Sequence, residues 1–110
     1  MAAYSGEIRT YAACVYANKG DQRTALVMRT DDQEYLVFFY RDGAQLPNNY
    51  TEVVGARRYF YIHTYFDTYS SLLDLLRNEK PVFAHYRDDL SRAEFNTNRE
   101  AVGEGEPPQT

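Results

Sequence analysis

Aromatic rings recur at every second position of the segment 57–65. If this segment forms a β-strand, alternate side chains point to opposite faces of the sheet. Phe60 and Ile62 then share one face, and the other face carries Arg57, Tyr59, Tyr61, His63 and Tyr65, which we call the tyrosine row. Such rings can stack on nucleobases or sugars. They can equally pack at a subunit contact or in a barrel interior, with their hydroxyls hydrogen-bonded.

Residues suited to catalysis or metal binding are few. His63 and His85 are the only histidines, and no nucleophile motif accompanies either of them. A zinc site would need further ligands, and Cys14 with an aspartate is the only supply. We therefore predict no catalytic residue, no metal site and no cofactor. A small enzyme that uses one of these histidines with a nearby carboxylate is the least favoured of the three functions that we consider for this chain.

The charge balance argues against general nucleic-acid binding. The chain has 12 lysines and arginines against 16 aspartates and glutamates, and only two of the basic residues are lysines. A protein that binds duplex nucleic acid without sequence preference needs several cations to displace phosphate counterions. Here the arginines alternate with acids. Nucleic acid or a nucleotide is therefore retained only as an alternative ligand.

The length of 110 residues suits one domain, which we expect over residues 1–99. Residues 100–110 combine glutamates with glycines and prolines, which predicts an acidic flexible tail. No apolar run is long enough to span a bilayer, and the N-terminus lacks the charged and apolar segments of a secretory signal. We expect a cytoplasmic protein that does not associate with membranes.

Short connections predict a meander of three strands over Gly6–Ala17, Thr24–Thr30 and Glu34–Arg41. Tyr50–Val54 is a candidate short strand that ends at a glycine, and Arg57–Tyr65 is a further strand. Two last strands are predicted at 81–87 and 92–99. Together these segments indicate a fold made mainly of β-structure.

One helix is predicted from about residue 68 to residue 79. Tyr69, Leu72, Leu73 and Leu76 follow the spacing of a single apolar stripe. The helix ends before Pro81, because the residue that precedes a proline avoids helical backbone angles.

The third predicted strand is apolar on both faces through its run Tyr35–Tyr40. Such a run is typical of a strand that is buried on two sides. Either the helix covers the second face, or another subunit does. With the excess of tyrosine, this run favours a homo-oligomer, and we predict an interface that includes Tyr35, Val37, Phe39 and Tyr40.

The predicted fold class is mainly β (α+β), as a small curled sheet or a partly open barrel of five to six strands with one helix. An open sheet with the helix on one face is the rival arrangement. The element order resembles that of an oligonucleotide/oligosaccharide-binding barrel, although the strand Arg57–Tyr65 departs from that pattern. We expect a noncatalytic oligomeric binding or adaptor module that contacts protein through an aromatic strand surface. The alternative, which the resemblance implies, is a binder of single-stranded nucleic acid or a nucleotide on the tyrosine row.

Overall fold

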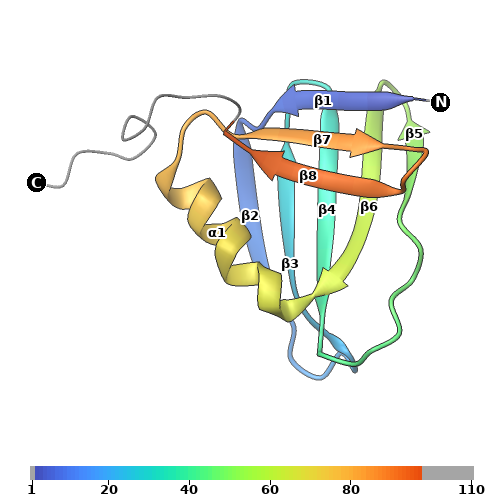
Figure 1. The fold of residues 1–110 in the computed structure, drawn as a ribbon, viewed down its shortest axis with the longest axis vertical. Helices are drawn as coiled ribbons and strands as arrows, with labels where there is room; N and C mark the ends of the chain where they lie inside the picture. The colour runs from blue at the N-terminus through green and yellow to red at the C-terminus, as the bar shows by residue number, and fades with distance from the viewer. Residues whose placement is uncertain (1, 98–110) are drawn as a thin grey trace, which may run out of the picture.

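The computed structural model of the chain describes residues 2–97, which form eight strands and one α-helix (Figure 1). The strands are β1 (Ala3–Glu7), β2 (Thr10–Val15), β3 (Gln22–Arg29), β4 (Gln33–Tyr40), β5 (Tyr50–Val54), β6 (Arg57–Tyr65), β7 (Phe83–Arg87) and β8 (Arg92–Asn96). A 3-10 turn, Phe66–Thr68, leads into α1 (Tyr69–Asn78). The predicted tail, 100–110, lies outside the described residues.

The strands form two sheets, with the orders β1-β7-β8 and β2-β3-β4-β6-β5. The mainly β class with one helix is confirmed, and the described strands do not close into a barrel. The predicted meander is also confirmed, because β2, β3 and β4 pair antiparallel in sequence order. The pairing of β6 with β4 is parallel. The hairpin of β5 and β6 turns at Gly55, whose φ of +65° suits a residue without a side chain.

The first predicted strand, Gly6–Ala17, is not continuous. Ile8 N donates to Val82 O beside β7 (2.8 Å), and the next residue, Arg9, donates through its backbone N to Arg29 O at the end of β3 (2.7 Å). Neighbouring residues thus join different sheets. The sheets approach closely at this corner, because a Cβ on Gly6 would come within 3.0 Å of Thr30 Cγ2.

One hydrophobic core lies between the two sheets. Strands β3, β4 and β6 contribute Leu26, Met28, Tyr35, Val37, Phe39, Phe60 and Ile62, and β7 contributes Ala84 and Tyr86. The rings of Tyr35 and Phe60 stack at a centroid distance of 4.3 Å. Burial of a ring of this size stabilises the fold by about 1.5–3 kcal/mol.

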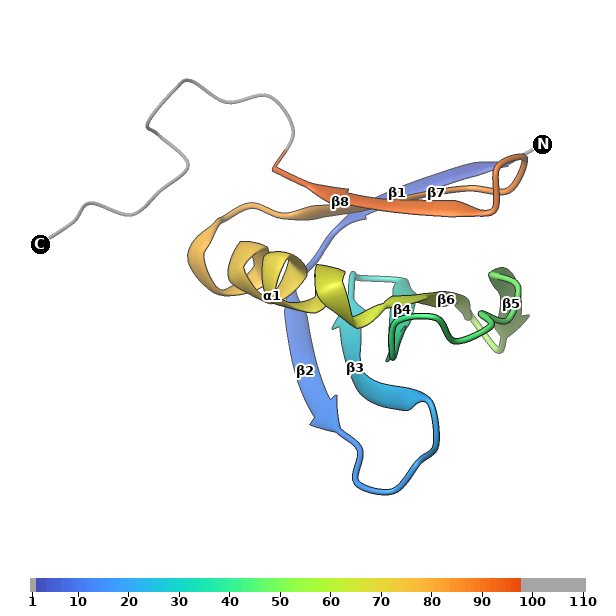
Figure 2. The ribbon, with the colours of Figure 1, turned by 60° about the horizontal axis from the view of Figure 1, so that its bottom comes forward.

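Helix α1 covers the same side of the five-stranded sheet as β1, β7 and β8 (Figures 1 and 2). Its predicted stripe, Tyr69, Leu72, Leu73 and Leu76, packs against the core. The ring of Tyr69 meets Phe39 edge-on at 5.2 Å. Figure 2 shows no described helix or strand on the other side of the five-stranded sheet.

Candidate functional site

The uncovered side of the five-stranded sheet carries two uncharged rows of side chains that run across the strands. The pairing registers place Ala12, Val27, Leu36, Tyr61 and Tyr50 in one row. They place Cys14, Ala25, Phe38 and His63 in the next. We call these nine residues the aromatic face; Ala25 is buried among its neighbours, and the other eight are half-buried or exposed. Their rings and aliphatic groups are contiguous because residues paired across neighbouring strands have their Cβ atoms about 5 Å apart.

The alternation predicted for 57–65 is present in β6. Phe60 and Ile62 are buried in the core, and all five residues of the tyrosine row are half-buried. The two ends of the row make hydrogen bonds to backbone: Arg57 Nη1 donates to Gln33 O (2.9 Å), and the Tyr65 hydroxyl donates to Ala44 O (2.9 Å). Tyr59 lies between Glu34 and Glu52 in a charged row across the strands. Only Tyr61 and His63 of the tyrosine row therefore belong to the aromatic face.

Tyr61 is held in place by its neighbours on β5. Its ring stacks on Tyr50 at a centroid distance of 4.6 Å with 17° between the planes. Its hydroxyl donates to Glu52 Oε1 at 2.9 Å. This hydrogen bond to a carboxylate raises the pKa of Tyr61 to about 12, with burial and the negative charge as further causes. The ring is thus fixed in one orientation, with less rotamer freedom to lose when a partner packs on it.

His63 lies among rings rather than among carboxylates. Its imidazole stacks on Phe38 (5.6 Å, 19°) and lies 5.9 Å from the ring of Tyr40. Burial lowers the pKa of His63, and the backbone of Asn48 opposes that shift. Within residues 2–97, the buried Nδ1 atom has no hydrogen-bond partner. A neutral imidazole in such surroundings behaves as a flat, mostly apolar ring.

The predicted interface residues divide between the two sides of β4. Tyr35, Val37 and Phe39 are at most 2% exposed in the core, so the interface prediction is wrong for these three. Tyr40 lies on the uncovered side, half-buried, and its hydroxyl accepts from Gln22 Nε2 (3.3 Å). The three-stranded sheet and α1 of the same chain cover the side of β4 that carries Tyr35, Val37 and Phe39. The side left without a cover carries Leu36 and Phe38, which the prediction omitted.

Besides Tyr61 and His63, which the tyrosine row already included, Leu36 and Phe38 could have been predicted from the sequence, whereas Tyr50 could not. Leu36 and Phe38 alternate with the buried residues of the run Tyr35–Tyr40, so strand alternation alone places them together on the opposite face. Tyr50 joins them only through the hairpin of β5 and β6. Cys14, which a strand interior would bury, is exposed because β2 is an edge strand.

Two arginines beside the aromatic face already have partners. Arg29 Nε lies 2.8 Å from Glu34 Oε1, directly across the strands. Arg57 is occupied by the carbonyl of Gln33. Glu52 adds a negative charge next to Tyr61. These two arginines therefore offer little positive charge to a phosphate group, and the nearby Lys19 ammonium lies over the ring of Tyr16.

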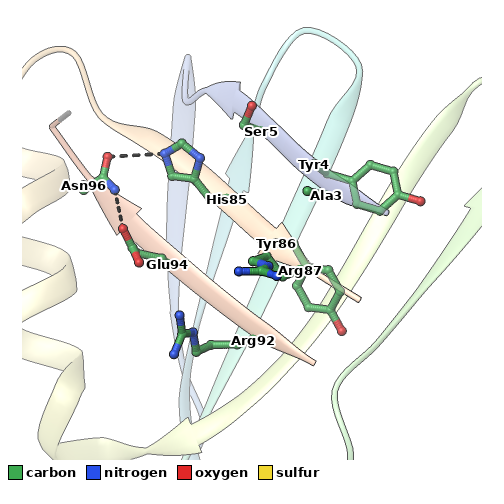
Figure 3. Close-up of a pocket in the computed structure, with 9 residues that line it drawn as sticks. All are labelled: Ala3, Tyr4, Ser5, His85, Tyr86, Arg87, Arg92, Glu94 and Asn96. Carbon is green, nitrogen blue, oxygen red and sulfur yellow. Dashed lines mark hydrogen bonds between the residues drawn. The ribbon is translucent and has the colours of Figure 1, made fainter. Parts of the chain in front are cut away.

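The outer face of the three-stranded sheet holds a polar hollow of about 420 Å³ (Figure 3). Ser5, His85 and Glu94 occupy one row across β1, β7 and β8. Asn96 separates the imidazole from the carboxylate: its Oδ1 lies 3.3 Å from His85 Nε2, and its Nδ2 donates to Glu94 Oε2 at 2.6 Å. His85 is thus oriented by an amide, and no contact joins its ring to Ser5 among the described residues. The arrangement lacks the nucleophile–base hydrogen bond of a catalytic triad.

The described chain offers neither a metal-binding cluster nor a membrane-spanning helix. Residues 2–97 contain no cluster of three or more histidine, cysteine or acidic side chains that could hold a metal ion. No helix among them is long and apolar enough to cross a bilayer. No family model matches the sequence, and no curated protein or solved structure is significantly similar to the chain.

Proposed function

We propose that this chain is a noncatalytic binding module that contacts protein, foremost a second copy of itself, through the aromatic face. The observation that carries the proposal is the uncharged, ring-rich side of the five-stranded sheet, which the chain's own helix and second sheet leave uncovered. Contiguous apolar patches on a surface mark interaction sites in soluble proteins.

The aromatic face suits a second sheet better than it suits nucleic acid. Two sheets pack face to face about 10 Å apart through interdigitating side chains, and Leu36, Phe38 and Tyr61 supply such side chains. Stacked bases would also meet these rings, but their phosphates would lie near Glu52 and near the paired Arg29. The rings of Tyr61 and Tyr50 already stack on each other instead of leaving a gap for a base.

The proposal is tested by comparing two lysine variants of aliphatic strand residues. Leu36→Lys places a charge in the middle of the aromatic face. Val15→Lys is the matched control, because Val15 is 77% exposed and lies on the opposite face of the sheet. Light scattering coupled to size exclusion should give an oligomer for the wild type and for Val15→Lys. It should give a folded monomer for Leu36→Lys.

Cys14 supplies an independent readout in the wild-type chain, because it lies on the aromatic face and is exposed in the single chain. Its reaction with a thiol reagent should slow as the protein concentration rises, and the Leu36→Lys variant should lose this dependence. A thiol whose reactivity is the same at all concentrations would count against self-association through this face. Oligomers of unchanged size in Leu36→Lys would place the contact elsewhere.

A further inference from the structure

Strand β8 has a free edge. In the β1–β7 ladder, Asp88 N donates to Ala2 O and Ile8 N donates to Val82 O, so the even-numbered residues of β7 bond to β1. The odd-numbered residues of β7 then bond to the even-numbered residues of β8. The backbone N–H and C=O groups of Ala93 and Phe95 consequently point away from the sheet. Across residues 2–97 they have no hydrogen-bond partner.

A cleft of about 460 Å³ runs along this free edge, between β8 and α1. In Figure 1, β8 is the strand of the front sheet that lies nearest α1, and the lower parts of β4 and β6 lie behind the space between them. The walls of the cleft are mostly apolar: Val37, Phe39, Ile62, Leu72, Leu75, Ala93 and Phe95. Its size falls in the range typical of ligand sites, about 300–1,000 Å³.

The polar groups of the cleft are unevenly distributed. Asn49 closes one end of the cleft, because its Nδ2 donates to Ser91 O at 2.9 Å. Ser91 comes just before the residues of β8 whose backbone groups are unpaired in the part of the chain that the structure describes, Ala93 and Phe95. Arg92 is the one charged residue among those that line the cleft, and no ion pair engages it within the described chain. The Arg92 side chain lies on the outer face of the three-stranded sheet (Figure 3), so it favours a negative charge on the outer side of an added strand.

We propose that this cleft binds an extended peptide segment of a partner protein, which adds to the free edge of β8 as a fourth strand. Backbone groups that point outward from an edge strand are recognised by another backbone, and a flanking apolar groove selects alternate side chains of the added strand. A fourth strand lies about 4.8 Å from β8, above the apolar floor formed by β4 and β6. By the strand register this surface is on the other side of the five-stranded sheet from the aromatic face, and His63 of β6 borders both.

The register of β8 sets the sequence of the peptide. In an antiparallel pair, residues directly opposite each other point to the same side. Peptide residues opposite Phe95 and Ala93 point into the cleft and should be apolar. The next residue lies opposite Arg92, at the solvent side, and should be acidic. The preferred peptide thus reads apolar, any residue, apolar, then aspartate or glutamate.

The test begins with the full chain and a display library of random dodecapeptides. Enriched peptides should share the alternating apolar pattern followed by an acid. Their affinity should fall about tenfold or more in Ala93→Pro, which removes one outward N–H donor and leaves the bonds to β7 intact. Ser5→Pro is the matched control: Ser5 N–H points outward from the opposite edge of the same sheet, so the affinity should stay within about twofold.

Hydrogen exchange in the wild-type chain tests the same proposal without a substitution. The amides of Ala93 and Phe95 should exchange faster than the amide of Glu94 in the free protein, and a bound peptide should slow both. Unchanged exchange at Ala93 and Phe95 with peptide bound would overturn the proposal, as would a library that enriches nothing. Peptides that bind Ala93→Pro as tightly as wild type but lose affinity for Leu36→Lys would instead assign peptide binding to the aromatic face.

Discussion

Replacement of Asn49 by alanine is expected to lower the free energy of unfolding by about 2–3 kcal/mol. The Asn49 side chain joins the two sheets at the side of the molecule where β5 begins. Its Oδ1 accepts from the backbone N of His63 on β6 at 2.7 Å. Its Nδ2 donates to Ser91 O, in the turn between β7 and β8, at 2.9 Å. A single amide group thus satisfies one backbone donor in one sheet and one backbone acceptor beside the other.

The magnitude follows from what alanine leaves behind. Each hydrogen bond contributes about 1 kcal/mol net, and a donor left unpaired away from water costs about 1–3 kcal/mol. His63 is half-buried, so water can only partly replace the hydrogen bond that its backbone N–H loses in Asn49→Ala. Ser91 is exposed, and water can bond to its carbonyl. The larger share of the loss therefore comes from the His63 end.

Two further variants separate the two ends of the Asn49 contact. Asn49→Asp keeps an acceptor for His63 N but sets a carboxylate oxygen against the Ser91 carbonyl. Because Ser91 is exposed to water, this variant should lose less stability than Asn49→Ala. Asn48→Ala is the matched control, because Asn48 is exposed, and it should change stability by less than about 0.5 kcal/mol. Urea unfolding followed by circular dichroism measures all four proteins, with equal slopes expected. Equal stability of Asn49→Ala and Asn48→Ala would refute the role of Asn49 as the link between the sheets.

Three other outcomes are expected. Leu73→Ala should destabilise the chain by about 2 kcal/mol in urea, because this half-buried residue of the helix packs on the core; a loss well under 1 kcal/mol would contradict that packing. In ultraviolet titration, Glu52→Gln should bring the pKa of Tyr61 from about 12 back towards 10.0. Because the folded-state pKa of Tyr61 is the higher one, the matching stabilisation is present below pH 10.0 and is lost as the pH rises towards 12, in the wild type only. The imidazole of His63 should titrate below 6.5 by NMR, and stability should fall as the pH drops through 6.5, less so in His63→Phe.

Local patterns in the sequence predicted most of the individual elements. The stripe from Tyr69 to Leu76 predicted the helix, because a 3.6-residue period needs no knowledge of distant contacts. The alternation along 57–65 predicted which side chains of β6 share a face, and Gly55 marked the turn that ends β5. These features depend on residues close together in the chain.

The arrangement of the strands and the helix depends on contacts between residues far apart in the chain, so local sequence patterns could not predict it. The crossing of the chain between sheets at Ile8 and Arg9 is set by hydrogen bonds to Val82 and Arg29. Alternation continues through this point, so the sequence pattern favours one long strand. The interface prediction failed for Tyr35 for a related reason. A strand that is apolar on both faces needs a packing partner on each face, but the sequence does not show which face packs against other elements of the same chain.

The mass of the unmodified chain in solution, measured by light scattering over a range of concentrations together with the 260/280 nm absorbance ratio, tests the proposed role of the aromatic face most directly. A concentration-dependent oligomer whose absorbance is that of protein alone is expected, because the uncovered rings of Phe38 and Tyr61 should be buried against a second copy. A monomer at every concentration that carries material absorbing at 260 nm would contradict self-association and assign the rings to a nucleotide or nucleic-acid ligand.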